Sequence, residues 1–140
     1  MDRRAARIVD ANLNRLSEGL KVVEDVLRLG FEHRGLLRGI RSLRNRLGRD
    51  TLVLRRRVVL ERHSEDDPGR PDRFDRARRR DLADVLAANF KRCQEACRVL
   101  EEVLKVEEPD LSAKLKQARF RLYDLERQAL ARAVKEMEAG

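Results

Sequence analysis

An internal repeat constrains the fold of this chain more than any other feature of its sequence. Residues 11–28 return 77 positions later as residues 88–105, and both copies read A-N-x-x-R-x-x-E-x-x-[KR]-V-x-E-[DE]-V-L-[KR]. Any amphipathic helix needs a recurring apolar skeleton, but Asn, Arg and two acids at fixed offsets inside that skeleton need a separate cause. The repeat therefore predicts a duplicated helical unit in which polar residues have kept their register.

Composition favours a single all-α domain. The chain has 140 residues, of which 41% are charged and 4% aromatic, and it contains no Trp. This length is enough for one hydrophobic core, and the abundance of Lys, Arg and Glu is typical of long helices with charged solvent faces. We expect residues 1–140 to form one helical domain.

Apolar residues at three- and four-residue spacing predict four helices. Gly30 and Gly48 are expected to end the first two, and Pro109 to break the chain before the last. Asp110 or Ser112 is the expected cap of that last helix. The predicted helices cover residues 3–29, 34–47, 78–106 and 111–137.

The duplicated unit is a whole helical hairpin, because Arg41–Leu47 in the second helix resembles Lys116–Leu122 in the fourth. The predicted fold is a four-helix bundle-like domain built from two such hairpins joined by a long charged loop. Residues 51–60 either continue the second helix or form a short extended piece, and propensity does not decide between these. The first hairpin with its connector, the charged loop and the second hairpin are assigned to residues 1–60, 61–77 and 78–140.

The charge balance favours anionic partners. The formal net charge is +8, and it comes mostly from Arg, whose planar guanidinium suits phosphate and carboxylate groups. Nucleotides and phosphorylated metabolites fit this charge. Nucleic acid is not an expected partner, because the chain carries no recognised DNA or RNA motif and few aromatic residues to stack bases.

Two cysteines, Cys93 and Cys97, stand one helical turn apart. With two distant histidines they fall short of the four clustered ligands of a structural zinc site, so we expect both to be small buried hydrophobes. No run of 18 apolar residues is present, which excludes a membrane-spanning helix. Free cysteines and this lack of a span favour a cytoplasmic protein.

The repeated polar residues border the apolar face of each helix. Asn12 lies at the edge of that face, and Arg15 and Glu18 follow along one flank in steps of about 60°. The second copy, Asn89, Arg92 and Glu95, repeats these angles. The two clusters are either i,i+3 ion pairs that hold the hairpins in register, or parts of a ligand site or symmetric interface.

Three motifs spread over the chain resemble one bacterial family. These are RIVDANLNRxxEGLKVVED at Arg7–Asp25, DLADVLAANFKRCQEACRVLEE at Asp81–Glu102 and FRLYDLE at Phe120–Glu126. They resemble the monofunctional hydroxymethylpyrimidine-phosphate kinases of thiamine biosynthesis, which occur alone or fused to the N-terminal side of thiamine phosphate synthase. The resemblance implies a standalone member or an isolated domain.

The implied reaction transfers a phosphoryl group from ATP to 4-amino-5-hydroxymethyl-2-methylpyrimidine phosphate, with Mg²⁺. The family pattern in the charged loop is matched at Arg62, Asp67 and Gly69, whereas His63 and Pro68 depart from it. No Gly-rich phosphate-binding loop is present, so ATP would be held by side chains.

Phosphoryl transfer requires cations on phosphate oxygens, carboxylates for Mg²⁺ and groups that orient the reactants. On this basis, we expect catalytic roles for Arg15, Glu18, Asp67, Arg92 and Glu95. Expected substrate- or nucleotide-binding residues are Asn12, Arg62, Gly69, Asn89, Arg119 and Arg121. Candidate Mg²⁺ ligands are Glu18, Glu95 and Asp67.

A second hypothesis makes the chain a non-enzymatic helical module that dimerises or docks onto thiamine phosphate synthase. In that case the twinned Asn and Arg residues would be polar contacts that set the register of an interface. We expect a homodimer, with thiamine phosphate synthase as a further partner.

Overall fold

The computed structural model describes residues 1–69 and 77–139, and within this part it contains helices and no strand. Three short helical turns follow the first two long helices: the π-helical η1 (Val26–Gly30) and the 3₁₀ turns η2 (Val59–Glu61) and η3 (Ser64–Asp66). The predicted all-α, four-helix class is confirmed. The long helices are α1 (Arg3–Asp25), α2 (Arg34–Val58), α3 (Leu82–Leu104) and α4 (Pro109–Ala139).

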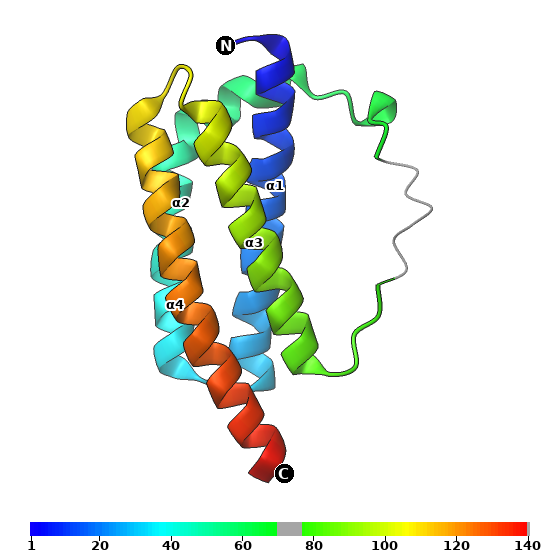
Figure 1. Ribbon diagram of the computed structural model, residues 1–140, viewed down its shortest axis with the longest axis vertical. Helices are drawn as coiled ribbons and strands as arrows, with labels where there is room; N and C mark the ends of the chain where they lie inside the picture. Colours follow the sequence, from blue (N-terminus) through cyan, green and yellow to red (C-terminus); the bar gives the residue numbers. More distant parts are fainter. Residues whose placement is uncertain (70–76, 140) are drawn as a thin grey trace.

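The helices form two antiparallel hairpins, α1 with α2 and α3 with α4, and α3 runs antiparallel to α1 (Figure 1). The centre of the contact between α1 and α3 brings together two positions that the repeat makes equivalent. Cys93 follows Leu16 by 77 residues, and its thiol donates a hydrogen bond to the Leu16 carbonyl over 3.7 Å. Equivalent positions meet in this way when an approximate twofold axis passes between the two helices.

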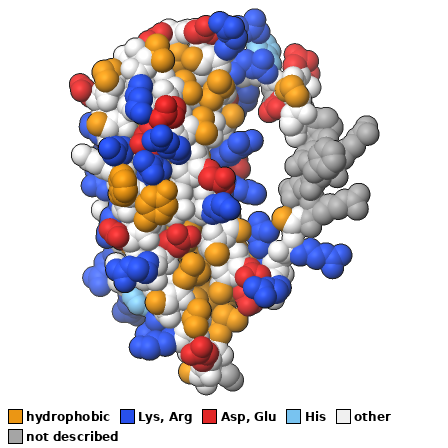
Figure 2. Space-filling view, viewed as in Figure 1, with side chains coloured by type: hydrophobic (Ala, Val, Ile, Leu, Met, Phe, Trp, Pro, Cys, Tyr) orange, Lys and Arg blue, Asp and Glu red, His pale blue; other side chains and the backbone are white. Residues whose placement is uncertain are grey.

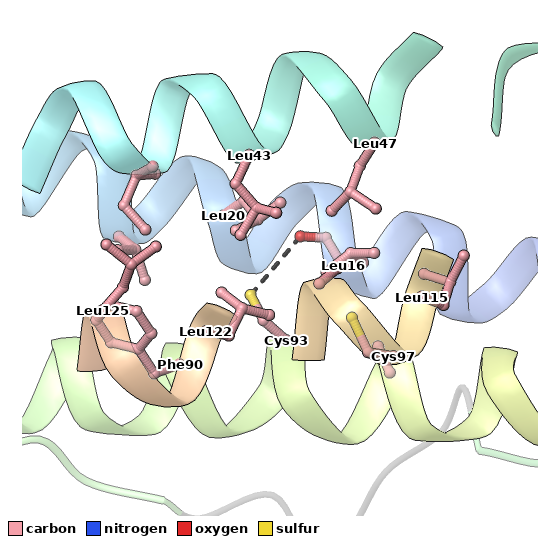
Figure 3. Close-up of a cluster of buried hydrophobic side chains, with 14 of the residues drawn as sticks. Leu16, Leu20, Leu43, Leu47, Phe90, Cys93, Cys97, Leu115, Leu122 and Leu125 are labelled. Carbon is pink, nitrogen blue, oxygen red and sulfur yellow. Dashed lines mark hydrogen bonds between the residues drawn. The ribbon is translucent and has the colours of Figure 1, made fainter. Parts of the chain in front are cut away.

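Leucines from all four helices supply about half of the core residues, and valines, alanines, Ile40, Phe90 and both cysteines supply the rest (Figure 3). Cys93 and Cys97 are buried and free, as the sequence predicted. Burial raises the pKa of both thiols to about 12, because the thiolate is poorly solvated among apolar groups. Within the described residues, no helix combines the length and apolar character needed to cross a membrane.

The prediction that Gly48 ends the second helix is wrong, because α2 continues through it to Val58. The buried positions Leu47, Thr51, Leu54 and Val58 keep the spacing of one helical face across the glycine. Packing of this face outweighs the cost of about 1 kcal/mol for a glycine inside a helix. Of the two options for residues 51–60, continuation of the helix is therefore the one observed.

Other helix boundaries also differ from prediction. The α3 helix begins at Leu82 and not at Arg78, because the Asp81 side chain accepts a hydrogen bond from the Asp84 amide and caps the helix there. Pro109 is the first residue of α4 and not a break before it, since proline at the first helical position loses no hydrogen bond. The Ser112 hydroxyl donates to the Glu101 carbonyl and is not a cap. Part of the predicted loop 61–77 lies outside the described residues.

The close approach of α1 to α3 predicts opposite effects for alanine at two glycines. A Cβ atom at Gly19 would lie 2.6 Å from the Cys93 sulfur and 3.3 Å from the Asn89 carbonyl oxygen, whereas one at Gly48 meets nothing within 4 Å. We expect Gly19→Ala to destabilise the fold by about 1–3 kcal/mol, and Gly48→Ala to stabilise it by up to about 1 kcal/mol.

Urea denaturation of both variants at neutral pH measures these free energies of unfolding. Equal stabilisation by the two alanines would contradict the close crossing of α1 and α3 at Gly19.

Candidate functional site

A cleft of about 600 Å³ lies between α1 and the segment that follows η2. This segment leaves the bundle beside the N-terminal half of α1, at the upper right of Figure 1. From α1, the cleft is lined by Arg4, Arg7, Ile8, Asp10, Ala11, Asn12, Asn14, Arg15 and Glu18. From the segment after η2, it is lined by Arg62, His63, Asp67 and Pro68.

Five of the predicted site residues meet in this cleft: Asn12, Arg15 and Glu18 from α1, and Arg62 and Asp67 from the connecting segment. Gly69 adjoins them, since its backbone amide donates to the Asp67 carboxylate over 2.8 Å and closes a turn. The cleft thus joins two parts of the chain whose motifs lie far apart in sequence.

The cleft is rich in guanidinium groups. Arg4 is paired with Asp2 at the helix start, and Arg7 donates to the His63 carbonyl over 3.4 Å. Neither Arg7 nor Arg15 is ion-paired with a carboxylate in the described part of the chain. Because Arg4 and Arg7 also lie in the first turns of α1, at the positive end of its dipole, this end of the cleft favours an anionic ligand.

Asp10 and Arg62 form the buried part of the site. Asp10 is 4% exposed, and its two carboxylate oxygens accept from Nε and Nη2 of Arg62, each over 2.8 Å. The hydrogen bonds to Asp10 raise the pKa of Arg62 above its ordinary value. Asp10 is not among the predicted site residues, because a single acid on a charged helix does not by itself indicate burial.

Asn14 is the cleft residue most clearly held by the rest of the bundle. Its side-chain oxygen accepts from Nη2 of Arg55 over 2.8 Å, and Nη1 of the same arginine donates to Ser17 over 3.1 Å. Arg55 comes from α2, so the second helix fixes this side of α1.

The second predicted cluster, Asn89, Arg92 and Glu95 on α3, does not line the cleft. Asn89 is half-buried and its amide donates to the Val85 carbonyl over 2.8 Å, as that of the buried Asn12 donates to the Ile8 carbonyl over 2.9 Å. The repeated asparagines thus bond to the preceding turn of their own helix.

The i,i+3 interpretation of the repeated charges is not supported. Arg15, Glu18, Arg92 and Glu95 are all exposed. Over the described residues, the structure pairs neither Arg15 with Glu18 nor Arg92 with Glu95. The repeated asparagines border the core as expected, whereas the arginines and first glutamates face outward.

The second glutamate of each repeat holds its hairpin together. Glu24 is buried and binds Arg41 of α2 over 2.8 Å, and it also binds Arg44. Its twin Glu101, 1% exposed, binds Arg119 of α4 over 2.5 Å. These twins are equivalent in both sequence and contact, so they belong to the architecture.

The structure places Arg119 and Arg121 away from the cleft. The Arg119 guanidinium also lies over the rings of Phe120 and Tyr123, 4.9 and 5.8 Å from their centroids. Tyr123 is 41% exposed. Arg121 lines a separate hollow of about 340 Å³ near the start of α2.

The two repeats differ at the positions of α1 that line the cleft. Arg4, Arg7 and Asp10 line the cleft on α1. The positions 77 residues later hold Asp81, Asp84 and Ala87. The N-terminal end of α1 is therefore basic, whereas the equivalent end of α3 is acidic. Comparing the two repeats position by position would have identified Arg4, Arg7 and Asp10 from the sequence.

No cluster of three or more His, Cys, Asp or Glu side chains that could hold a metal ion occurs among the residues that the structure describes. Two of the three candidate Mg²⁺ ligands, Glu18 and Asp67, line the cleft, and Glu95 does not. Magnesium bound together with substrate phosphates is commonly held by one or two carboxylates and water.

The model of the ThiD2 family matches residues 7–128. The chain belongs to the ThiD2 family. The matched range contains α1 from Arg7 onward, all of α2 and α3, and most of α4. It includes every described residue of the cleft except Arg4.

Curated relatives of this ThiD2 chain carry the name thiamine-phosphate synthase. Those of Gloeobacter violaceus and Thermosynechococcus vestitus are each 43% identical, over 86% and 88% of this chain. That of a Synechococcus species is 40% identical over 90% of the chain. The chain spans about a third of the length of these relatives, 34 to 35%. No solved structure matches it.

The ion pairs of Glu24 predict a defined dependence of stability on pH. Burial by itself raises the pKa of this carboxyl group, but hydrogen bonds and charges from Arg41 and Arg44 outweigh burial and hold the pKa below its ordinary value of 4.5. A depressed folded pKa stabilises the fold fully above the ordinary value, and this stabilisation is lost as pH falls through the folded pKa.

We therefore expect Glu24→Gln to cost about 2 kcal/mol at neutral pH, and this difference from the unaltered chain to shrink below pH 4.5. Urea denaturation between neutral and acidic pH measures it. Glu136→Gln, which removes an exposed i,i+4 pair with Arg132, is the control and should cost about 0.5 kcal/mol or less. A Glu24→Gln difference that stays constant into strong acid would contradict this role.

Proposed function

We propose that the cleft between α1 and the segment after η2 binds ATP and 4-amino-5-hydroxymethyl-2-methylpyrimidine phosphate, and that the chain transfers the terminal phosphoryl group of ATP to the phosphate of the pyrimidine. The observation that carries this proposal is the meeting of Arg15 and Glu18 with Arg62 and Asp67 in one basic cleft. Two motifs that resemble the pyrimidine-phosphate kinases contribute to the same surface.

The comparisons support a role in thiamine biosynthesis. The chain belongs to the ThiD2 family, and its relatives are named for the synthesis of thiamine phosphate. Because the chain covers about a third of each relative, the activity named there concerns a longer protein. A separate activity for this domain, preparing the pyrimidine diphosphate that such a synthase consumes, accounts for the presence of both parts in one chain.

This reaction requires cations that neutralise the phosphate groups more than it requires a general base that deprotonates the nucleophile. An oxygen of the pyrimidine phosphate attacks the terminal phosphorus of ATP, the bond from that phosphorus to the bridging oxygen breaks, and ADP leaves. A phosphate monoester has a second pKa of about 6, so the nucleophile is already ionised at neutral pH. The main obstacle is repulsion between two anions, and Arg7 and Arg15 are the guanidinium groups that we assign to it.

The remaining cleft residues have complementary roles. Glu18 and Asp67 would hold Mg²⁺, which supplies charge neutralisation on the phosphate oxygens. Asn12 lines the cleft, and although its amide nitrogen donates to the Ile8 carbonyl, its side-chain oxygen is an acceptor suited to the amino group of the pyrimidine. Ile8, 44% exposed, gives the ring an apolar wall. Arg62 reaches the same cleft but is already paired with Asp10.

The activity is tested directly with the purified chain, Mg·ATP and the pyrimidine monophosphate. We expect ADP release in step with formation of the pyrimidine diphosphate, followed by ³¹P NMR, because a diphosphate gives two coupled phosphorus signals. ADP release no faster than without the pyrimidine would overturn the proposal.

Arg15 and its twin Arg92 provide an internal comparison. Both are exposed arginines at equivalent positions, but only Arg15 lines the cleft. We expect Arg15→Ala to lower kcat/KM by about 100-fold, as for loss of a charged donor to a developing anion. Arg92→Ala should lower it by less than about tenfold, and thermal midpoints should change little in either variant.

Equal losses in the two variants would instead mean that both twinned clusters take part in the reaction. Arg127→Ala, on the exposed side of α4, controls for the loss of one positive charge.

A docking function is the second candidate, and one exposed pair favours it. Phe120 and Tyr123 are 52% and 41% exposed and pack edge to face, with ring centroids 5.9 Å apart. The equivalent positions of the first hairpin are Asn45 and Gly48, so the hairpin does not need aromatic residues there. Aromatic side chains are enriched in interfaces, and a second copy of the chain or a thiamine phosphate synthase domain would be the partner.

A further inference from the structure

Asp10 is a buried carboxylate whose two oxygens both bind Arg62. It is 4% exposed, and the contact that satisfies both of its oxygens is the side-on pair with Nε and Nη2 of Arg62, at 2.8 Å each. A buried carboxylate without a cation is strongly unfavourable, so the folded chain must keep Arg62 at this place.

This pair ties the start of the connecting segment to α1. Asp10 lies in the second turn of α1, and Arg62 is the first residue after η2, in an extended conformation with φ −71° and ψ 128°. From Arg62 the chain continues to His63, Asp67 and Pro68, which form one wall of the cleft. The position of this wall next to α1 therefore depends on the direction in which the chain leaves η2.

The other contacts of the segment with α1 are weaker. Arg3 approaches Glu61 at 3.4 Å and His63 at 3.0 Å, and Arg7 donates to the His63 carbonyl over 3.4 Å. All of these contacts are exposed to solvent, where single ion pairs and hydrogen bonds contribute little. The Asp10–Arg62 pair is the buried, bidentate one.

The internal repeat indicates that this carboxylate is not needed for helix packing. The position equivalent to Asp10 on α3 holds Ala87, which is half-buried. An alanine at this place is thus compatible with the same helix face in the other hairpin. The acid on α1 thus coincides with the cleft, which the equivalent part of α3 does not line.

We infer that Asp10 is a positioning residue whose ion pair with Arg62 holds residues 62–68 against α1 as the second wall of the cleft. Arg62 acts through this wall, because the Nε–Nη2 edge of its guanidinium is occupied by Asp10. The effect on turnover depends on the proposed kinase function, whereas the effect on the segment does not.

Asp10→Ala separates the two roles of Arg62. If Arg62 is a positioning residue, Asp10→Ala and Arg62→Ala should each speed amide hydrogen exchange at residues 62–68 by about tenfold and raise KM for both substrates by about tenfold, with a smaller change in kcat. The double variant should be no worse than either single one, because the two residues act as a unit.

If Arg62 instead binds phosphate directly, Arg62→Ala will abolish turnover while Asp10→Ala, which leaves the guanidinium in place, retains it. That result would overturn the inference, as would unchanged exchange at residues 62–68 in Asp10→Ala. Accelerated exchange in a chain without kinase activity would leave the positioning role standing and refute the proposed function alone.

Asp50→Asn is the matched control. It removes an interhelical ion pair with Lys114, 3.6 Å long and away from the cleft, and should change neither exchange at residues 62–68 nor KM. Thermal midpoints of all variants identify any general loss of folding. If Arg62→Ala does not fold, because it leaves the buried Asp10 carboxylate without a cation, Asp10→Ala still reports on the exchange of the segment, since the arginine that it leaves unpaired is 42% exposed.

Discussion

The arrangement of both hairpins depends on the close crossing of α1 and α3. At Gly19 the two helices leave no room for a Cβ atom, which would lie 3.3 Å from the Asn89 carbonyl oxygen. At the centre of this crossing, Leu16 and its twin Cys93 are joined by a hydrogen bond, as Figure 3 shows. Because equivalent residues meet there, the hairpins are related by an approximate twofold axis, and each places its second helix on the same side of the core.

This symmetry separates architecture from function. Where twins are identical and make the same contact, as Glu24 and Glu101 do with arginines of the facing helix, they hold each hairpin together. Where twins differ, as Asp10 and Ala87 do, the difference coincides with the cleft. Basic and acidic side chains are interspersed over the face of the molecule seen in Figure 2, so total charge alone does not locate the site.

Helical periodicity predicted much of the fold but misjudged several polar residues. The number of helices and the burial of Cys93 and Cys97 follow from local spacing, which a helix converts directly into a face. Arg119, like Arg15, is an arginine within a family motif or repeat and was expected at the site, yet its guanidinium is bound by Glu101 and lies over the rings of Phe120 and Tyr123. Gly48 failed as a terminator because the buried face continues on both sides of it.

The sequence by itself determined the duplication, the all-α class and the residues that face the core, because each of these depends on spacing within a single helix. Only the tertiary structure decided which polar residues share a cleft. Asp10 and Arg62 are 52 positions apart, and their pairing depends on where the chain leaves η2 relative to α1. Such a contact has no local periodicity to reveal it, whereas the burial of one carboxylate in the folded bundle makes it necessary.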